Sequence, residues 1–71
     1  MAMKVSQKFG NRIKELRAIR GLTQEDLAEL SGLSRQYIGD VERGVRNISL
    51  VNIEKIARAF KIALSELFNF E

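Results

Sequence analysis

Apolar residues recur three or four positions apart along most of the chain, which is the spacing of one face of an α-helix. The first such segment runs from about Ser6 to Arg20 and carries Phe9, Ile13 and Leu16 at this spacing. Gly21 follows it, and a glycine there favours a helix end because it adopts the left-handed backbone conformation at little cost. No alternation of apolar and polar residues typical of a strand persists anywhere. The pattern predicts an all-α protein.

Two further segments begin at residues that commonly cap helices. Thr23, followed three residues later by Asp26, is similar to a capping box in which Asp replaces the usual Glu, and it predicts a helix over 24–31. Ser34 is a natural N-cap for a third helix over 35–43. The second and third helices are therefore short and closely connected.

The remaining sequence predicts two more helices. Ser49 caps a helix over 50–60, and Ser65 starts a last short helix. The core-facing stripe of the fourth helix is Leu50, Ile53, Ile56, Ala57 and Phe60. Connections are short and no repeat or linker is present, so we expect residues 1–71 to form one compact five-helix domain.

The joint between the second and third helices has the geometry of a helix-turn-helix, over residues 23–43. Ala28 lies where the two helices cross, so a larger side chain would force them apart, and Gly32 lies in a turn that requires positive φ. Four apolar residues point into this junction, namely Leu27, Leu33, Ile38 and Val41. The alternative is a corner of two helices with no DNA-related function.

Composition excludes several classes of function. The chain has no Cys and no His, so it lacks a disulfide, a thiolate metal site and the usual proton shuttle. We therefore expect no metal, no cofactor and no enzymatic activity. We also expect no small-molecule effector, since the pattern offers no obvious pocket or second domain.

Charge adds a first indication of a partner. The net charge is +3, and residues 1–20 carry six basic residues against Glu15 alone. A local basic excess suits an anionic polymer, although the same charges can simply solvate helix faces. No stretch approaches the ~18 to 20 apolar residues of a membrane span, and the start has no apolar leader segment, so we expect a cytoplasmic protein. Met1 and Ala2 are open to interpretation as vector-derived residues ahead of a native Met3.

The sequence also resembles a known family. Residues 13–44 read IKELRAIRGLTQEDLAELSGLSRQYIGDVERG and resemble the helix-turn-helix family of the Cro and phage-repressor type, also called the xenobiotic-response-element type. Residues 46–68, RNISLVNIEKIARAFKIALSELF, are similar to the last two helices of that family. Within that family, the sequence most resembles the controller proteins of restriction–modification systems. The resemblance implies a transcriptional regulator that binds a near-palindromic double-stranded DNA operator as a homodimer.

In this arrangement the first turn of the third helix enters the major groove. Arg35 and Gln36 are best placed to read base edges, since Arg suits the acceptors of guanine and Gln suits adenine. The helix dipole disfavours a cation in a first turn, which favours an external anion or base edge for Arg35. For Tyr37 two roles stay open: its ring packs on the helix-turn-helix surface, or its hydroxyl contacts a phosphate or a base edge.

Phosphate contacts are expected on both sides of this helix. The candidates are Thr23, Gln24, Ser34, Arg43 and Asn47. The resemblance implies a phosphate contact for Gln24, whereas Thr23 and Ser34 can equally act only as N-caps. Arg43, Arg46 and Asn47 lie in the loop that follows the third helix. In similar controller proteins an Arg of this loop contacts bases, so Arg46 is both a phosphate and a base-reading candidate.

Three other residues of this region have different expected roles. The resemblance implies an ion pair between Arg17 and Glu42, which joins the first helix to the end of the third. Asp40 can accept from a cytosine amine, act as a repulsive filter, or remain solvated. Gly39 in a helix interior suggests close approach to DNA or to the second helix.

The C-terminal part, about residues 50–70, predicts a dimer interface. Val51 lies off the core stripe of the fourth helix, and the C-terminal residues carry more apolar surface than a short terminal helix can bury. The interface candidates are Val51, Leu64, Leu67, Phe68 and Phe70. The alternative is that Phe68 closes the monomer core while Phe70 is frayed. A twofold dimer would present two recognition helices about 34 Å apart. An antitoxin or a protein-interaction module is the alternative function, and the operator, its genes and the sign of regulation stay open.

Overall fold

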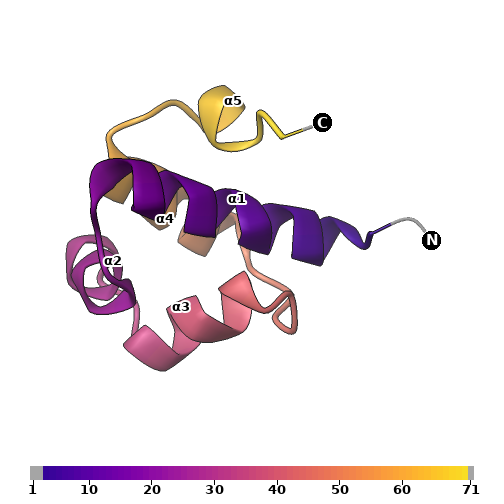
Figure 1. Ribbon diagram of the computed structural model, residues 1–71, viewed down its shortest axis with the longest axis horizontal. Coiled ribbons are helices and arrows are strands. Elements are labelled where there is room, and N and C mark those ends of the chain that lie inside the picture. Colours follow the sequence, from indigo (N-terminus) through magenta and orange to yellow (C-terminus); the bar gives the residue numbers. More distant parts are fainter. Residues whose placement is uncertain (1–2, 71) are drawn as a thin grey trace.

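The computed structural model describes residues 3–70, so Met1 and Ala2 lie outside the described residues. Five α-helices follow one another along the chain (Figure 1): α1 Val5–Arg20, α2 Gln24–Ser31, α3 Arg35–Glu42, α4 Leu50–Phe60 and α5 Leu64–Leu67. No strand occurs within the described residues. The all-α fold with five helices predicted from the sequence is confirmed.

The ends of α2 are formed by the residues that the sequence indicates. The Thr23 hydroxyl accepts from the Asp26 N–H at 3.0 Å, while an Asp26 carboxylate oxygen accepts from the Thr23 N–H at 3.0 Å. These hydrogen bonds lower the pKa of the Asp26 carboxyl, so the stabilisation is present above its ordinary pKa of 3.8 and is lost as the pH falls below it. At the other end, Gly32 has φ 77° and ends the helix in the left-handed conformation.

Serine hydroxyls cap the next two helices. The Ser34 oxygen accepts from the Tyr37 N–H at 3.0 Å, and the Ser49 oxygen accepts from the Asn52 N–H at 3.2 Å. Both contacts satisfy a backbone donor that has no partner within its helix. The predicted starts of α3 and α4 are confirmed.

The last helix differs from its prediction. It begins at Leu64 after Ala63, whose extended backbone (φ −70°, ψ 156°) takes the capping position without a side-chain hydrogen bond, so Ser65 is not the cap. The Arg12 guanidinium of α1 donates to the carbonyls of Glu66 at 2.8 Å and Leu67 at 3.3 Å. The helix ends there, and Phe68 and Phe70 lie beyond it.

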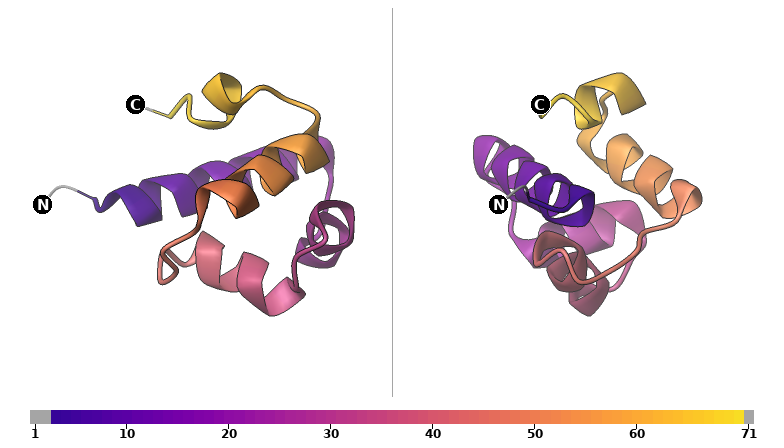
Figure 2. Two further views of the ribbon diagram at one scale, coloured as in Figure 1. Left: turned by 180° about the vertical axis from the view of Figure 1, so that it is seen from behind. Right: turned by 90° about the vertical axis from the view of Figure 1, so that its right-hand side faces the viewer.

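The helices surround one apolar core. α3 packs against α1 and α2, whereas α4 packs against α2 and α5. Figures 1 and 2 show α5 on one side of α1 and α3 on the other. Every helix contributes to the buried set, which consists of Phe9, Ile13, Leu16, Leu27, Ala28, Ile38, Val41, Ile53, Ile56, Ala57, Phe60 and Leu67.

The stripe predicted for α4 needs one correction. Leu50 is 82% exposed and is not a core residue, although Ile53, Ile56 and Phe60 are buried as expected. Leu50 is the first residue of α4, directly after its cap, so it lies beyond the end of the core. Periodicity alone does not show where along a helix its packing partners stop.

A close approach between α1 and α3 was not anticipated from the sequence. A Cβ atom built on the buried Gly10 would lie 2.7 Å from the Glu42 carbonyl oxygen and closer still to that of Val41. Backbone atoms cannot move aside as a flexible side chain can, so only glycine fits this crossing. The contact brings the last turn of α3 directly onto α1.

Beside this crossing, a buried carboxylate joins three helices. Glu42 is 3% exposed and accepts from Arg17 through both oxygens, at 2.6 Å from Nε and 2.9 Å from Nη2. Arg17 also donates to the Leu22 carbonyl at 2.9 Å, and Gln24 Nε2 donates to Glu42 at 2.9 Å. The hydrogen bond to Glu42 raises the pKa of Arg17 above its ordinary value. The ion pair thus connects α1, the start of α2 and the end of α3.

We expect Arg17→Ala to lower the free energy of unfolding by about 3 kcal/mol, because it leaves the buried Glu42 charge with Gln24 as its remaining side-chain partner. Urea unfolding followed by circular dichroism, at one fixed chain concentration, measures this change. Lys14→Ala, which removes an exposed cation from the same helix, should cost less than about 0.5 kcal/mol. Equal losses in the two variants would contradict the role given to Arg17.

A pair of glycine substitutions tests the crossing of α1 and α3. Gly10→Ala should destabilise the protein by about 2 kcal/mol, because its methyl group would meet backbone carbonyls. Gly39→Ala should stabilise it by up to about 1 kcal/mol, because a Cβ there lies 3.4 Å from Arg43 Nη1 and 3.9 Å from Gln24, with helix propensity gained. Thermal unfolding of both variants gives the two signs, and a stable Gly10→Ala protein would rule out the close approach.

Candidate nucleic-acid interface

The first turn of α3 carries exposed polar side chains that have no partner. Arg35 and Gln36 are exposed, and neither side chain makes a hydrogen bond within the described residues. Ile38, Val41 and Glu42 of the same helix are buried, so the helix presents its other face to solvent. Figure 1 shows this turn at the edge of the molecule farthest from α5. An extended ligand can reach it without rearrangement of the core.

Tyr37, next in sequence, already has contacts within the protein. Its ring is half-buried and packs against the core, and its hydroxyl accepts from Asn52 Nδ2 of α4 at 3.0 Å. The Arg46 guanidinium lies over the ring, 4.5 Å from its centroid. The packing role considered for Tyr37 is therefore present in the structure, and a contact with DNA stays a prediction.

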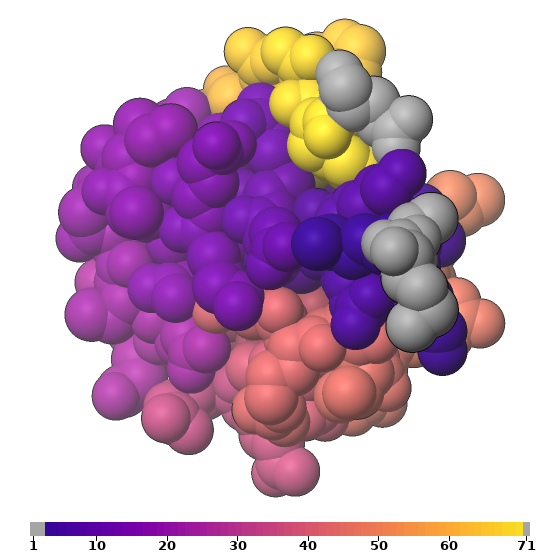
Figure 3. Space-filling model, turned by 45° about the vertical axis from the view of Figure 1, so that its right-hand side comes forward, coloured from indigo at the N-terminus to yellow at the C-terminus, as the bar shows by residue number. Residues whose placement is uncertain are grey.

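The segment after α3 holds the other predicted contacts. The cations Arg43 and Arg46 and the neutral Asn47 are exposed there. Figure 3 shows this segment beside the start of α1. The Ser6 hydroxyl donates to the Gly44 carbonyl at 3.1 Å, which attaches this segment to α1. The segment therefore lies next to α3 and can extend a contact surface that begins at Arg35.

Asp40 explains how these cations are arranged. One carboxylate oxygen pairs with Arg43, and the other accepts from Arg46 Nη2 at 3.1 Å. In the free protein both Asp40 oxygens are therefore paired with arginines, so Asp40 is not simply a solvated carboxylate and has no unpaired oxygen for a cytosine amine. Gly39 lies near the Gln24 side chain of α2, but a Cβ atom there would be 3.9 Å from it, so the second helix does not approach closely enough to require glycine.

The remaining phosphate candidates lie at the starts of α2 and α3. The oxygens of Thr23 and Ser34 are used as caps, while each hydroxyl keeps its own O–H as a donor. Gln24 is half-buried, and its amide nitrogen donates to Glu42. The N-termini of both helices nevertheless face solvent with a positive dipole end, which suits an anion.

The predicted dimer residues separate into exposed and buried ones. Leu67 is fully buried in the monomer core, so its assignment to an interface is wrong. Phe70 is half-buried against the core, and the Phe68 ring lies 5.3 Å from that of Phe9 while Phe68 remains 41% exposed. Four exposed residues border one shallow hollow between α4 and α5 and form what we call the apolar face: Leu50, Val51, Leu64 and Phe68. Leu50 was missed because the periodicity assigned it to the core.

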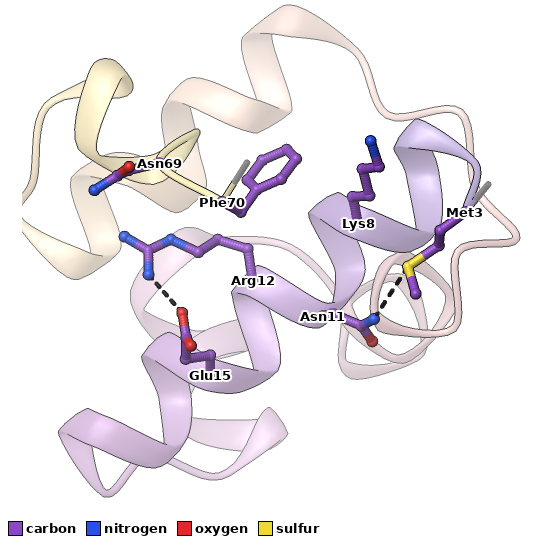
Figure 4. A pocket seen from close by; sticks show the side chains of 7 residues that line it. All are labelled: Met3, Lys8, Asn11, Arg12, Glu15, Asn69 and Phe70. Carbon is purple, nitrogen blue, oxygen red and sulfur yellow. Dashed lines mark hydrogen bonds and ion pairs between the residues drawn. The ribbon is translucent and has the colours of Figure 1, made fainter.

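A different hollow lies beside α1 and the C-terminal segment (Figure 4). It is lined by Met3, Lys8, Asn11, Arg12, Glu15, Asn69 and Phe70. Its polar groups bond to one another, with Arg12 to Glu15 at 2.6 Å and Asn11 Nδ2 to Met3 Sδ at 3.4 Å. Arg12 also holds the end of α5, so this hollow is a joint between elements.

Within residues 3–70, no group of three or more Asp and Glu side chains is placed to hold a metal ion. No helix of this part of the chain has the length and apolar character needed to cross a membrane.

Comparison with known proteins agrees with this geometry. The helix-turn-helix family HTH_3 matches residues 13–67. Control protein C.MunI of Mycoplasma sp is 48% identical over 63 residues, which cover 87% of this chain and 85% of that protein. Control protein C.BamHI of Bacillus amyloliquefaciens is 43% identical over 63 residues, 87% of this chain and 78% of that protein.

A solved structure gives the same result. The restriction-modification controller protein C.AhdI from Aeromonas hydrophila is 60% identical, has a TM-score of 0.86, and the match covers 89% of this chain and 96% of that one. The family resemblance read from residues 13–68 is thus confirmed. The chain belongs to the HTH_3 helix-turn-helix family of DNA-binding transcriptional regulators.

Proposed function

We propose that this protein regulates the genes of a restriction–modification system by binding a near-palindromic operator as a homodimer. The observation that carries the proposal is the exposed first turn of α3, where Arg35 and Gln36 have no partner inside the protein. The controller proteins to which the chain is similar support the choice of gene system. The protein acts in the cytoplasm, without a small-molecule effector and without catalysis.

In this proposal the helix-turn-helix over 23–43 places α3 in the major groove. Arg35 donates to the two acceptors of guanine and Gln36 pairs with adenine, each worth about 1–3 kcal/mol of discrimination. Arg35 lies at the end of the helix where the dipole disfavours a cation, which a negative base edge or phosphate compensates. Tyr37, the third residue of α3, and Arg46, in the segment after α3, extend this reading surface.

Phosphate contacts fix the helix in register. Thr23, Gln24 and Ser34 lie at the N-termini of α2 and α3, where backbone N–H groups meet phosphate oxygens. Arg43 and Asn47 contact the backbone from the segment after α3. These contacts carry affinity for any duplex, whereas the first turn of α3 carries the preference.

The apolar face supplies the dimer contact, within a dimerisation region of about residues 50–70. Exposed apolar residues that cluster on one face, such as Leu50 and Val51, favour association because burial removes them from water. One recognition helix reads too few base pairs to define a genomic site, and a twofold pair reads two half-sites about 34 Å apart. The dimer and the near-palindrome therefore require each other.

The alternative function is an antitoxin or protein-interaction module built on the same fold. Salt separates the two, because affinity for DNA falls with a slope of about −0.9 per phosphate contacted. A partner protein recognised through the apolar face would show little such dependence.

Arg35 substitutions test the base-reading role. Against a duplex selected by the wild type from a random pool, Arg35→Ala should lose about tenfold or more in affinity while non-specific binding is largely kept. Arg35→Lys is the matched control for charge: it keeps the cation, loses the bidentate fork and should lose preference with little change on random duplexes. Fluorescence anisotropy with both duplexes measures the two affinities. Equal losses on both duplexes would count against base reading by Arg35.

Charged substitutions test the dimer. Val51→Asp places a charge in the apolar face and should convert a micromolar dimer into a monomer with unchanged helix content, because an unpaired charge is costly to bury. Ile19→Asp changes a similarly exposed apolar residue of α1 and should leave the dimer intact. Sedimentation equilibrium distinguishes these states, and a wild-type monomer at micromolar concentration would refute the dimer.

A further inference from the structure

Two cations that the proposed function assigns to DNA are paired inside the free protein. Arg43 and Arg46 each bond to a different oxygen of Asp40, so one carboxylate bridges the C-terminal end of α3 and the segment after it. The Asp40 side chain is only 16% exposed, while those of Arg43 and Arg46 are 63% and 43% exposed. The carboxylate thus lies beneath the two guanidinium groups, which form the outer surface.

Arg46 is held by a second contact as well. Its guanidinium lies 4.5 Å from the centroid of the Tyr37 ring, and the Tyr37 hydroxyl is fixed by Asn52 of α4. Tyr37 is the third residue of α3 and directly follows Gln36, which has no partner. The bridge at Asp40 therefore connects the cations of the loop to the base-reading end of the helix.

Carboxylate and phosphate oxygens are equivalent ligands for a guanidinium group, since both accept charge-assisted hydrogen bonds. A DNA phosphate that binds Arg43 or Arg46 therefore competes with Asp40 for the same N–H donors. The negative charge of Asp40 also lowers the local attraction for the DNA backbone, which dominates binding to random sequence. A duplex that offers base contacts to Arg35 and Gln36 gains those contacts in addition, and the cost of releasing Arg43 and Arg46 from Asp40 is the same on both kinds of duplex.

We propose that Asp40 is a positioning residue: it occupies Arg43 and Arg46 in the free protein and lowers the affinity for duplex DNA of any sequence. The inference rests on the proposed function, because it requires duplex DNA as the competing ligand. Its effect is general, because the free protein is the common starting state for every duplex, whether Arg46 then contacts a phosphate or a base. Asp40 acts through the two arginines and makes no base contact of its own.

Asp40→Asn tests the inference, with Glu29→Gln as the matched control. Glu29 is an exposed residue of α2 whose side chain has no partner among the described residues, so its variant loses the same charge without releasing a cation. Binding is measured by fluorescence anisotropy at several salt concentrations, to random duplexes of about two helical turns and to the duplex selected by the wild type.

Asp40→Asn should bind random duplexes about threefold to tenfold more tightly than wild type, with a salt slope steeper by about 1. Affinity for the selected duplex should rise by a similar factor, so that the ratio of the two affinities changes little. Glu29→Gln should shift both affinities slightly and equally. An Asp40→Asn protein that matches Glu29→Gln, or that loses affinity for random duplexes, would overturn the inference.

A second measurement does not depend on DNA. In the free wild-type protein, the ring current of Tyr37, the only tyrosine of the chain, should shift the side-chain protons of Arg46 upfield in NMR spectra. Asp40→Asn should lose this shift, and Glu29→Gln should keep it. An unchanged shift in Asp40→Asn overturns the holding role of Asp40. A wild-type protein that binds neither duplex refutes the proposed function instead, which keeps the two failures distinct.

Discussion

The buried carboxylate of Glu42 is the interaction on which the arrangement of this protein depends. It lies at the end of α3, accepts two hydrogen bonds from Arg17 of α1 and a third from Gln24 of α2. A buried charge is tolerated only where its oxygens are satisfied, so the three helices are held in one relative position. In the proposed complex with DNA, these bonds define the angle at which the exposed turn of α3 is presented. On that proposal, stability and recognition depend on the same few atoms.

Much of the fold could be predicted from local signals. Thr23, Ser34 and Ser49 cap helices because their hydroxyls satisfy backbone donors, and such a contact needs only residues three apart. The core positions of α1 and α4 follow from periodicity for the same reason. The exposed state of Arg35 and Gln36 also follows, because the opposite side of α3 carries Ile38 and Val41.

What the sequence did not indicate depends on contacts between distant segments. Leu50 was expected in the core and is exposed, whereas Leu67 was expected at an interface and is buried. Burial depends on where a neighbouring helix ends and not only on spacing along one helix. The requirement for glycine at position 10 comes from backbone carbonyls of α3, about thirty residues away in sequence. The pairing of Asp40 with two arginines likewise depends on how the segment after α3 turns back. A signal for Gly10 was available, since a glycine within a helix pattern often marks a close approach.

The bonds from Arg12 to the end of α5 have a consequence for how two subunits would fit together. They anchor the C-terminal side of the apolar face to α1, the helix that also supports α3 through Gly10 and Arg17. In the proposed dimer, the distance between the two DNA-reading turns then depends on α1 of each subunit, which connects the apolar face to α3. The preferred gap between half-sites becomes a built-in length of the protein, adjustable by changes far from any nucleotide.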